Sequence, residues 1–482
     1  MDPINYIGEH SFAGELGHWL ALISFTGAAF AGIAYLLHTL KGEDGWRALG
    51  RLFFRLHSVA VLGIIVTLFV MLFNHWYEYD YVWKHSNSVM PLRYIASCFW
   101  EGQEGSFLLF TFWNVVLGNL LIRRAKEWEG PVLAVFALTQ VFLASMLLGL
   151  YLPGLPRIGS SPFLLIRELP ENIGMPWIRL PDYLAKIPQF QDGRGLNPLL
   201  QNYWMVIHPP VLFLGFASTI VPFAFAFAGL VNKDHKWINA ALPWASFSGA
   251  VLGLGIMMGA MWAYESLSFG GYWAWDPVEN ASLVPWLTLI AGLHCNLIYK
   301  HSGYSLRATY FFYIISFILI LYSTFLTRSG VLGDTSVHSF VEPGMFAQVI
   351  LILFMVVFAL LGFGFVIYRT KDIGGATDNF STKSREFSLS IGSALIMGSA
   401  IIVFIGTSWP LMAELIHQPK IAIDPSFYNK MHLPLHVEEK VALLRMYTEE
   451  NMHNLSQPVM LYFKEPFKGS IRKGSAGHHR YG

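Results

Sequence analysis

The sequence predicts an all-α polytopic membrane protein: a helical bundle of about ten transmembrane helices that carries an aromatic loop on its outer face. The chain has 482 residues, of which 54% are apolar and only 13% are charged, whereas charged residues make up about 25% of a soluble domain. Apolar runs long enough to cross a bilayer recur along it. Between two of these runs lies a stretch, residues 262–286, that is dense in tryptophan.

Ten runs approach the roughly 20 residues that a membrane-spanning helix needs. They lie near residues 18 to 39, 52 to 74, 105 to 122, 131 to 152, 206 to 230, 241 to 262, 281 to 299, 308 to 327, 345 to 368 and 387 to 409. Residues 1–17 have no basic segment followed by an apolar core and a small-residue cleavage site. We therefore expect the first run to act as its own insertion signal.

Lysine and arginine are concentrated in the loops that follow the odd-numbered runs. These basic residues are Lys41, Arg47, Arg51, Arg55, Arg123, Arg124, Lys126, Lys233, Lys236, Lys300, Arg307, Arg369, Lys371, Lys383 and Arg385. The loops after the second, sixth and eighth runs contain only Lys84, Arg93 and Arg328. By the positive-inside rule the N-terminus and the aromatic loop face the outside.

This topology divides the chain into four parts. Residues 1–152 hold helices 1–4, and residues 206–410 hold helices 5–10 with the aromatic loop 262–286. Between them, the outer loop 153–205 is rich in proline and glycine. It is long enough to fold over the outer face as a lid, and its composition fits an irregular surface segment equally well. Residues 411–482 form a polar tail that we also expect outside.

Composition also excludes several classes of function. A net charge of +1 gives no indication of nucleic-acid binding. Cys98 and Cys295 are far apart and form neither a CxxC nor a CxxCH motif. The chain is therefore not predicted to be a thiol oxidoreductase or a covalent c-type haem carrier.

The aromatic loop combines indole rings with two carboxylates and paired glycines. Its members are Trp262, Gly270, Gly271, Trp273, Trp275, Asp276, Glu279 and Trp286. Glycines permit a tight turn, and the indoles are expected to form a flat apolar surface for a large planar ligand. A belt of aromatic residues at the membrane interface would explain any one of these tryptophans as well, but it would not call for the glycines and the carboxylates.

Histidines on the same side of the membrane could hold such a ligand. His208 precedes two prolines at the opening of the fifth run, where proline is tolerated, and His338 follows the eighth run. Two imidazoles on opposite sides of a porphyrin give a six-coordinate haem iron; each histidine alone fits an interfacial hydrogen bond. Arg328 matches a haem propionate, or it is a cation that extends to the interface from a helix end.

His294 lies inside the seventh run, roughly 20 Å from its outer end at about 1.5 Å per residue. An ionisable group at that depth indicates a functional site. It could ligate a second haem within the membrane, or it could form a hydrogen bond between helices.

The run Trp273-Ala-Trp-Asp-Pro-Val-Glu-Asn-Ala-Ser-Leu-Val-Pro-Trp286 resembles the WWD domain of haem-handling proteins, most closely the CcmF-type cytochrome c haem lyases. The resemblance covers most of residues 10 to about 430. Its further motifs are Trp100-Glu-Gly-Gln-Glu-Gly-Ser106, Asn197-Pro-Leu-Leu200, Ile207-His-Pro-Pro-Val211, Gly259-Ala-Met-Trp-Ala-Tyr264, Phe325-Leu-Thr-Arg-Ser-Gly-Val331, Ser336-Val-His-Ser-Phe340 and Pro425-Ser-Phe-Tyr-Asn429.

The resemblance implies that His208 and His338 ligate a transient external haem received from the haem chaperone CcmE, and that the WWD loop is its platform. It also implies that His294 is one of two ligands of a haem b in the membrane. The implied activity is attachment of haem vinyl groups to the CxxCH cysteines of an apocytochrome c, which thiol-reducing chaperones of the CcmH/CcmI type keep reduced. The setting is the periplasmic face of the bacterial inner membrane. No residue of this chain is expected to act as a nucleophile, because the chain positions haem against thiols that the substrate supplies.

Two departures from the family pattern stand out. Phe269 and Tyr272 replace family aromatic residues in the loop, and the family continues beyond Asn429 with spans that hold the second haem b ligand. A second chain carrying those spans, a truncated chain, or a protein that does not hold haem b alone would each account for this. A haem exporter is the alternative function, and a respiratory subunit with bound haem b is disfavoured, since it would require paired histidines on facing spans.

Overall fold

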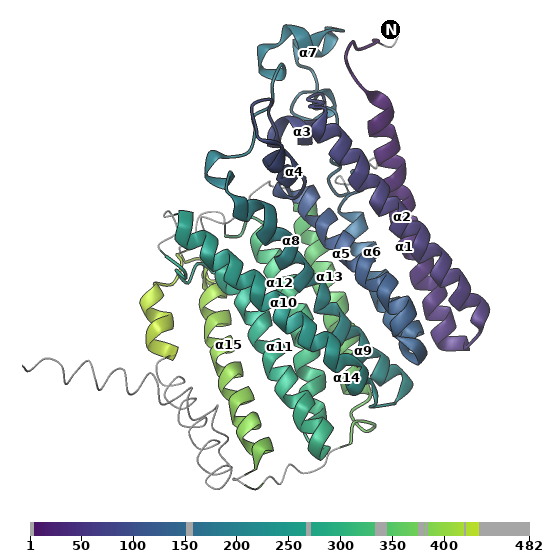
Figure 1. Cartoon of the computed structure of the whole chain (residues 1–482), viewed down its shortest axis with the longest axis vertical. Coiled ribbons are helices and arrows are strands. Elements are labelled where there is room, and N and C mark those ends of the chain that lie inside the picture. The colour runs from purple at the N-terminus through teal and green to yellow at the C-terminus, as the bar shows by residue number, and fades with distance from the viewer. Residues whose placement is uncertain are drawn as a thin grey trace, which may run out of the picture.

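The computed structural model describes residues 4–150, 158–266, 271–332, 345–374, 381, 384–418 and 421–432. Within these residues ten helical segments are long and apolar enough to cross a membrane. This confirms the predicted all-α bundle. The helices run roughly parallel to one long axis, and a smaller group of short helices sits at one end (Figure 1).

The N-terminal half of the bundle is built from four helices: α1 (Ser11–Lys41), α2 (Asp44–Phe73), α5 (Gln103–Arg124) and α6 (Glu129–Ser145). The α1 helix ends at Gly42, whose φ of 74° is a left-handed conformation that glycine adopts without steric cost. The buried Glu129 carboxylate accepts two hydrogen bonds from Arg51, at 2.7 and 2.5 Å. That bidentate pair fastens α6 to α2.

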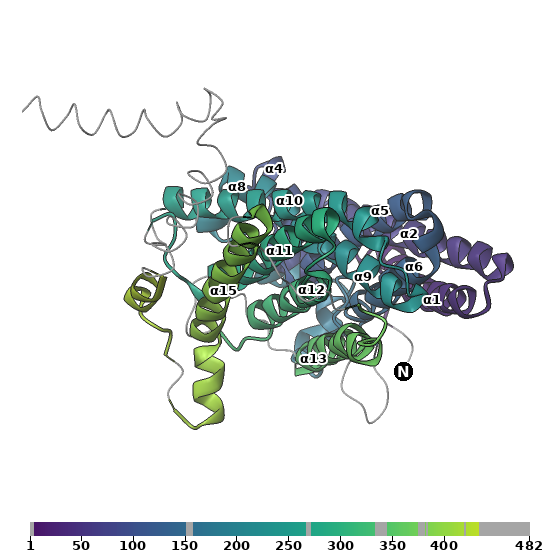
Figure 2. The same cartoon turned by 90° about the horizontal axis from the view of Figure 1, so that it is seen from below.

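The C-terminal half contains the remaining helices of the bundle. These are α8 (Tyr203–Ser218), α9 (Ile220–Asn232), α10 (Trp237–Ser266), α11 (Pro277–Ser302), α12 (Leu306–Arg328), α13 (Met345–Ala359), α14 (Phe365–Tyr368) and α15 (Arg385–Leu415). The predicted fifth span is divided at Thr219 into α8 and α9. A π-helical segment, Leu360–Gly364, joins α13 to α14. Viewed from below, α15 lies beside α11 and α13 lies beside α12 (Figure 2).

A compact head covers one end of the bundle. It contains α3 (Asp80–His85), α4 (Leu92–Glu101), α7 (Tyr183–Lys186) and the short 3-10 helices Ile166–Glu168, Pro176–Arg179, Pro188–Phe190 and Pro198–Leu200. Arg167 pairs with Glu9 at 2.8 Å, and the indole of Trp83 donates to the carbonyl of Gln189 at 2.8 Å. The described part of loop 153–205 therefore packs against the N-terminus and the segment between α2 and α5.

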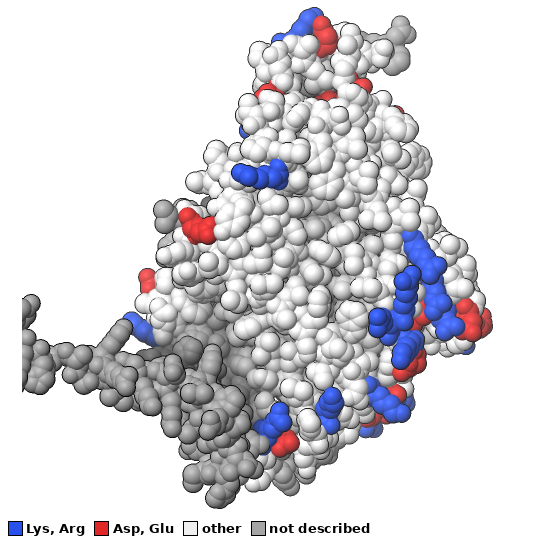
Figure 3. Space-filling model, in the orientation of Figure 1, with Lys and Arg blue, Asp and Glu red and all other residues white. Residues whose placement is uncertain are grey.

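Charged side chains mark the two ends of the molecule. Most of the lysine and arginine atoms visible in Figure 3 gather at the end opposite the head, and the middle of this face is almost uncharged. The loop between α1 and α2 lies at that end (Figure 1). This distribution matches the loops that the sequence marks as basic.

Candidate functional site

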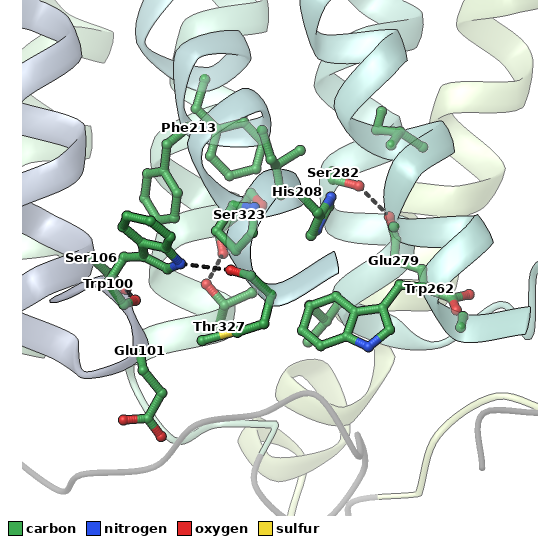
Figure 4. Close-up of a pocket in the computed structure, with 18 of the residues that line it drawn as sticks. Trp100, Glu101, Ser106, His208, Phe213, Trp262, Glu279, Ser282, Ser323 and Thr327 are labelled. Atoms are coloured by element: carbon green, nitrogen blue, oxygen red, sulfur yellow. Dashed lines mark hydrogen bonds between the residues drawn. The ribbon is translucent and has the colours of Figure 1, made fainter. Parts of the chain in front are cut away.

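A cavity of about 440 Å³ opens where the head meets the C-terminal helices. Its volume lies within the range of about 300 to 1,000 Å³ that is typical of cofactor and small-molecule sites. Of the predicted site residues, the cavity wall includes His208, Trp262, Trp273, Glu279 and Arg328. Figure 4 shows several of its side chains, with His208 near the centre of the view.

His208 lies in the second turn of α8, because the helix begins at Tyr203 after the Asn202 side chain accepts from the N–H of Trp204 at 3.1 Å. The expectation that its prolines sit at the opening of the helix is therefore wrong, since Pro209 and Pro210 lie inside it. The imidazole packs edge-on against Trp262, with 5.8 Å between ring centres. Gly259 makes this approach possible, because a Cβ there would lie 3.0 Å from His208 Cε1.

The four tryptophans predicted to form one surface face different parts of the structure. Trp262 and Trp273 line the cavity, and their buried indole nitrogens have no hydrogen-bond partner within the described residues. Trp275 is perpendicular to Trp273, at 89°. Trp286 donates to the carbonyl of Gly249 at 2.8 Å and so fastens α11 to α10. The single flat surface that the composition predicts is therefore wrong for these residues.

Trp275 turns away because its backbone is left-handed, with a φ of 57°. Its ring stacks on Tyr428 at 4.9 Å and on His432 at 5.3 Å, and its indole N–H donates to Asn429 at 3.0 Å. The motif around Tyr428 thus supports the WWD loop from behind. The sequence contains this motif but gives no indication of its role.

Asp276 and Glu279 begin α11 as a capping box. Asp276 Oδ1 accepts from the N–H of Val278 at 2.8 Å, and Glu279 Oε2 accepts from the N–H groups of Ala274 and Asp276 at 3.0 and 3.2 Å. Pro277 occupies the first helical position, where no donor is needed. The spacing of the two carboxylates is thus explained by the N–H groups at the start of the helix, which have no partner within the helix itself. This Asp-x-x-Glu spacing could be read from the sequence.

Arg328 ends α12 at the cavity wall, and its guanidinium donates to the hydroxyl of Ser106 at 2.5 Å. Trp100, Glu101 and Ser106 also line the cavity. Their motif was visible in the sequence, but nothing there placed it beside His208. His338 and Phe269 lie outside the described residues, and Tyr272 stacks on Tyr264 with ring centres 4.2 Å apart.

His294 lies on α11, away from the cavity. Its Nδ1 is buried and has no hydrogen-bond partner within the described residues. The α15 helix passes close to it, since a Cβ at Gly392 would lie 3.8 Å from that nitrogen. A buried imidazole nitrogen with no partner fits one axial ligand of a haem. Across the described part of the chain, no group of three or more metal-ligating side chains accompanies it.

Comparison with known proteins shows which proteins the chain resembles. A family model described as cytochrome C assembly protein matches residues 100–332, the interval from Trp100 to just beyond Arg328. The cytochrome c-type biogenesis protein CcmF of Pseudomonas fluorescens is 32% identical over 437 residues, which cover 88% of this chain and 60% of that protein. CcmF of Pseudomonas aeruginosa is 33% identical over 433 residues, with 87% and 60% covered. This chain is similar to the CcmF proteins over most of its length.

The predicted resemblance to CcmF is therefore confirmed. A solved structure entitled cytochrome c haem lyase CcmF matches with a TM-score of 0.69 at 23% identity, covering 97% of this chain and 67% of that one. At this identity the match shows a shared fold. The chain spans about 60% of the length of the curated CcmF relatives that it matches.

Proposed function

We propose that this chain receives haem at the cavity beside His208 and holds it for covalent attachment to an apocytochrome c. One observation carries the proposal: His208, Trp262, Trp273 and Arg328, from separate parts of the chain, converge on one largely apolar cavity. A neutral imidazole ligates haem iron, indole rings pack against a porphyrin face, and a guanidinium matches a propionate.

The reaction joins haem to thiols that the substrate brings. Each thiol adds across a haem vinyl group, so that a carbon–sulfur bond forms at one vinyl carbon and the thiol proton passes to the other. The chain contributes positioning, since it holds the vinyl groups beside a CxxCH segment. The haem would come from a chaperone of the CcmE type, and CcmH/CcmI-type chaperones would keep the apocytochrome reduced.

The other site assignments belong to the same proposal. His338 would also ligate the iron of the external haem, and the WWD loop 262–286 would be the platform for that haem. His294 would hold a haem b within the membrane, which supplies electron transfer when bound. The charge distribution supports a chain embedded in the bacterial inner membrane, with its N-terminus and WWD loop in the periplasm.

Haem spectra test the proposal. Wild-type protein, His208→Ala and His294→Ala are purified from cells that express the maturation system, and their pyridine haemochrome spectra are compared. We expect His208→Ala to lose chaperone-derived haem and His294→Ala to lose resident haem b. His235→Ala is the control, because His235 contacts the Asp372 carbonyl at 3.1 Å, away from the cavity.

Unchanged haem content in His208→Ala would overturn the ligand assignment. Haem attachment itself is measured by staining c-type cytochromes in cells that carry His338→Ala in place of the wild-type chain. Normal cytochrome levels in those cells would refute the role proposed for His338.

A further inference from the structure

The helix that carries His208, α8, lacks one backbone hydrogen-bond donor because its sequence contains Pro209. Pro209 has no N–H group, so it cannot donate to the carbonyl four residues earlier, which belongs to Met205. Met205 is buried, with 5% of its surface exposed. A buried carbonyl without a donor destabilises the fold, and this one lies one turn before His208.

The indole of Trp100 supplies the missing donor. Trp100 Nε1 donates to the Met205 carbonyl at 2.8 Å, across 105 positions of sequence. Trp100 belongs to α4 in the head, and its ring lines the same cavity as His208 (Figure 4). A hydrogen bond from outside the helix thus replaces the one that proline removes.

The main chain of Trp100 is itself held in place. Its carbonyl accepts from the Ser106 hydroxyl at 3.0 Å, and that hydroxyl accepts from the Arg328 guanidinium at 2.5 Å. This connection joins α4, α5 and α12, and the Trp100 indole extends it to α8. The turn of α8 that presents His208 is therefore connected through Trp100 to three other helices.

We propose that Trp100 is a positioning residue for His208: its indole N–H takes the place of the Pro209 donor and sets the direction in which α8 holds the imidazole. The inference rests on the proposed haem-binding role of His208. It assigns a purpose to the Trp100-Glu-Gly-Gln-Glu-Gly-Ser106 motif, whose tryptophan acts through the helix and not through contact with iron.

The test uses the full chain with Trp100→Phe, which keeps the aromatic ring and removes the donor. The matched control is Trp113→Phe on α5, because the Trp113 indole nitrogen is buried and has no hydrogen-bond partner in the described structure. Haem affinity is measured by titrating haemin into detergent-solubilised protein, and the Soret spectrum reports the ligation state. We expect Trp100→Phe to weaken binding by up to about fivefold, the scale of one net hydrogen bond, and to shift the Soret band. Trp113→Phe should change neither.

A second variant separates positioning from simple packing. Pro209→Ala restores a backbone N–H donor to the Met205 carbonyl. In that background Trp100→Phe should reduce haem affinity only slightly, and the double variant should have the same Soret band as Pro209→Ala alone. If Trp100→Phe by itself does not fold, the double variant is still expected to fold and bind. The inference would be overturned if Trp100→Phe reduced haem affinity equally with and without Pro209→Ala, or if the double variant did not fold and bind haem. Loss of haem in His208→Ala with none in Trp100→Phe would reject the inference alone, and no loss in His208→Ala would reject the proposed function first.

Discussion

The two carboxylates of the WWD loop offer a direct test of what this motif does. The capping box at the start of α11 implies that Asp276 serves the helix, whereas the family resemblance places it beside haem. Asp276→Asn retains an oxygen that can accept from the N–H of Val278, now 2.8 Å from Oδ1. Asp276→Ala removes the acceptor altogether.

The size of each effect follows from these contacts. Loss of an N-cap side chain costs about 0.5 to 2 kcal/mol, so Asp276→Ala should destabilise the start of α11 by about 1 kcal/mol. Asp276→Asn keeps the hydrogen bond and loses only the interaction of the charge with the helix dipole, which is worth about 0.3 to 1 kcal/mol. Glu279→Ala removes the acceptor of two N–H groups, at 3.0 and 3.2 Å, and we expect it to cost about 1 to 3 kcal/mol.

Thermal unfolding in detergent and haem retained per protein are measured together on these variants. If the cap is the reason for Asp276, stability and haem retention decline in parallel, in the order wild type, Asp276→Asn, Asp276→Ala. The reasoning fails if Asp276→Asn loses haem as completely as Asp276→Ala while its unfolding temperature stays at the wild-type value. That result would mean the carboxylate contacts the ligand directly.

Two further predictions concern the surroundings of the site. Gly259→Ala places a Cβ 3.0 Å from His208 Cε1, so the imidazole must shift. We expect the affinity for haemin to fall several-fold while the unfolding temperature stays unchanged. Wild-type affinity would contradict the packing argument. Hydrogen bonds from the hydroxyl and the N–H of Ser426 hold the pKa of Asp424 below its usual range. A depressed carboxyl pKa stabilises the fold above its unfolded value of about 3.9 and loses that contribution as pH falls through the folded pKa. Acidification below about pH 4 should therefore weaken the start of the short helix 425–432, which packs against Trp275. The expected signal is a change in tryptophan fluorescence that Asp424→Asn abolishes.

The sequence by itself determined the class of protein and most of its local structure. An apolar run of spanning length forms a helix in a bilayer, because its backbone N–H and C=O groups must then bond to one another. The Asp276 to Glu279 spacing likewise determines a helix start through contacts between near neighbours. Local rules of this kind depend on few residues, so one sequence is enough to apply them.

The tertiary structure alone decided which distant residues share the cavity and what each tryptophan does. Trp275 faces Tyr428 and Trp286 faces α10, although composition puts them in one motif with Trp273. Trp100 reaches Met205 over 105 positions, and no periodicity or motif spacing encodes that meeting. Such contacts arise only when whole helices pack, since the direction of each side chain depends on the rotation of its helix against all its neighbours.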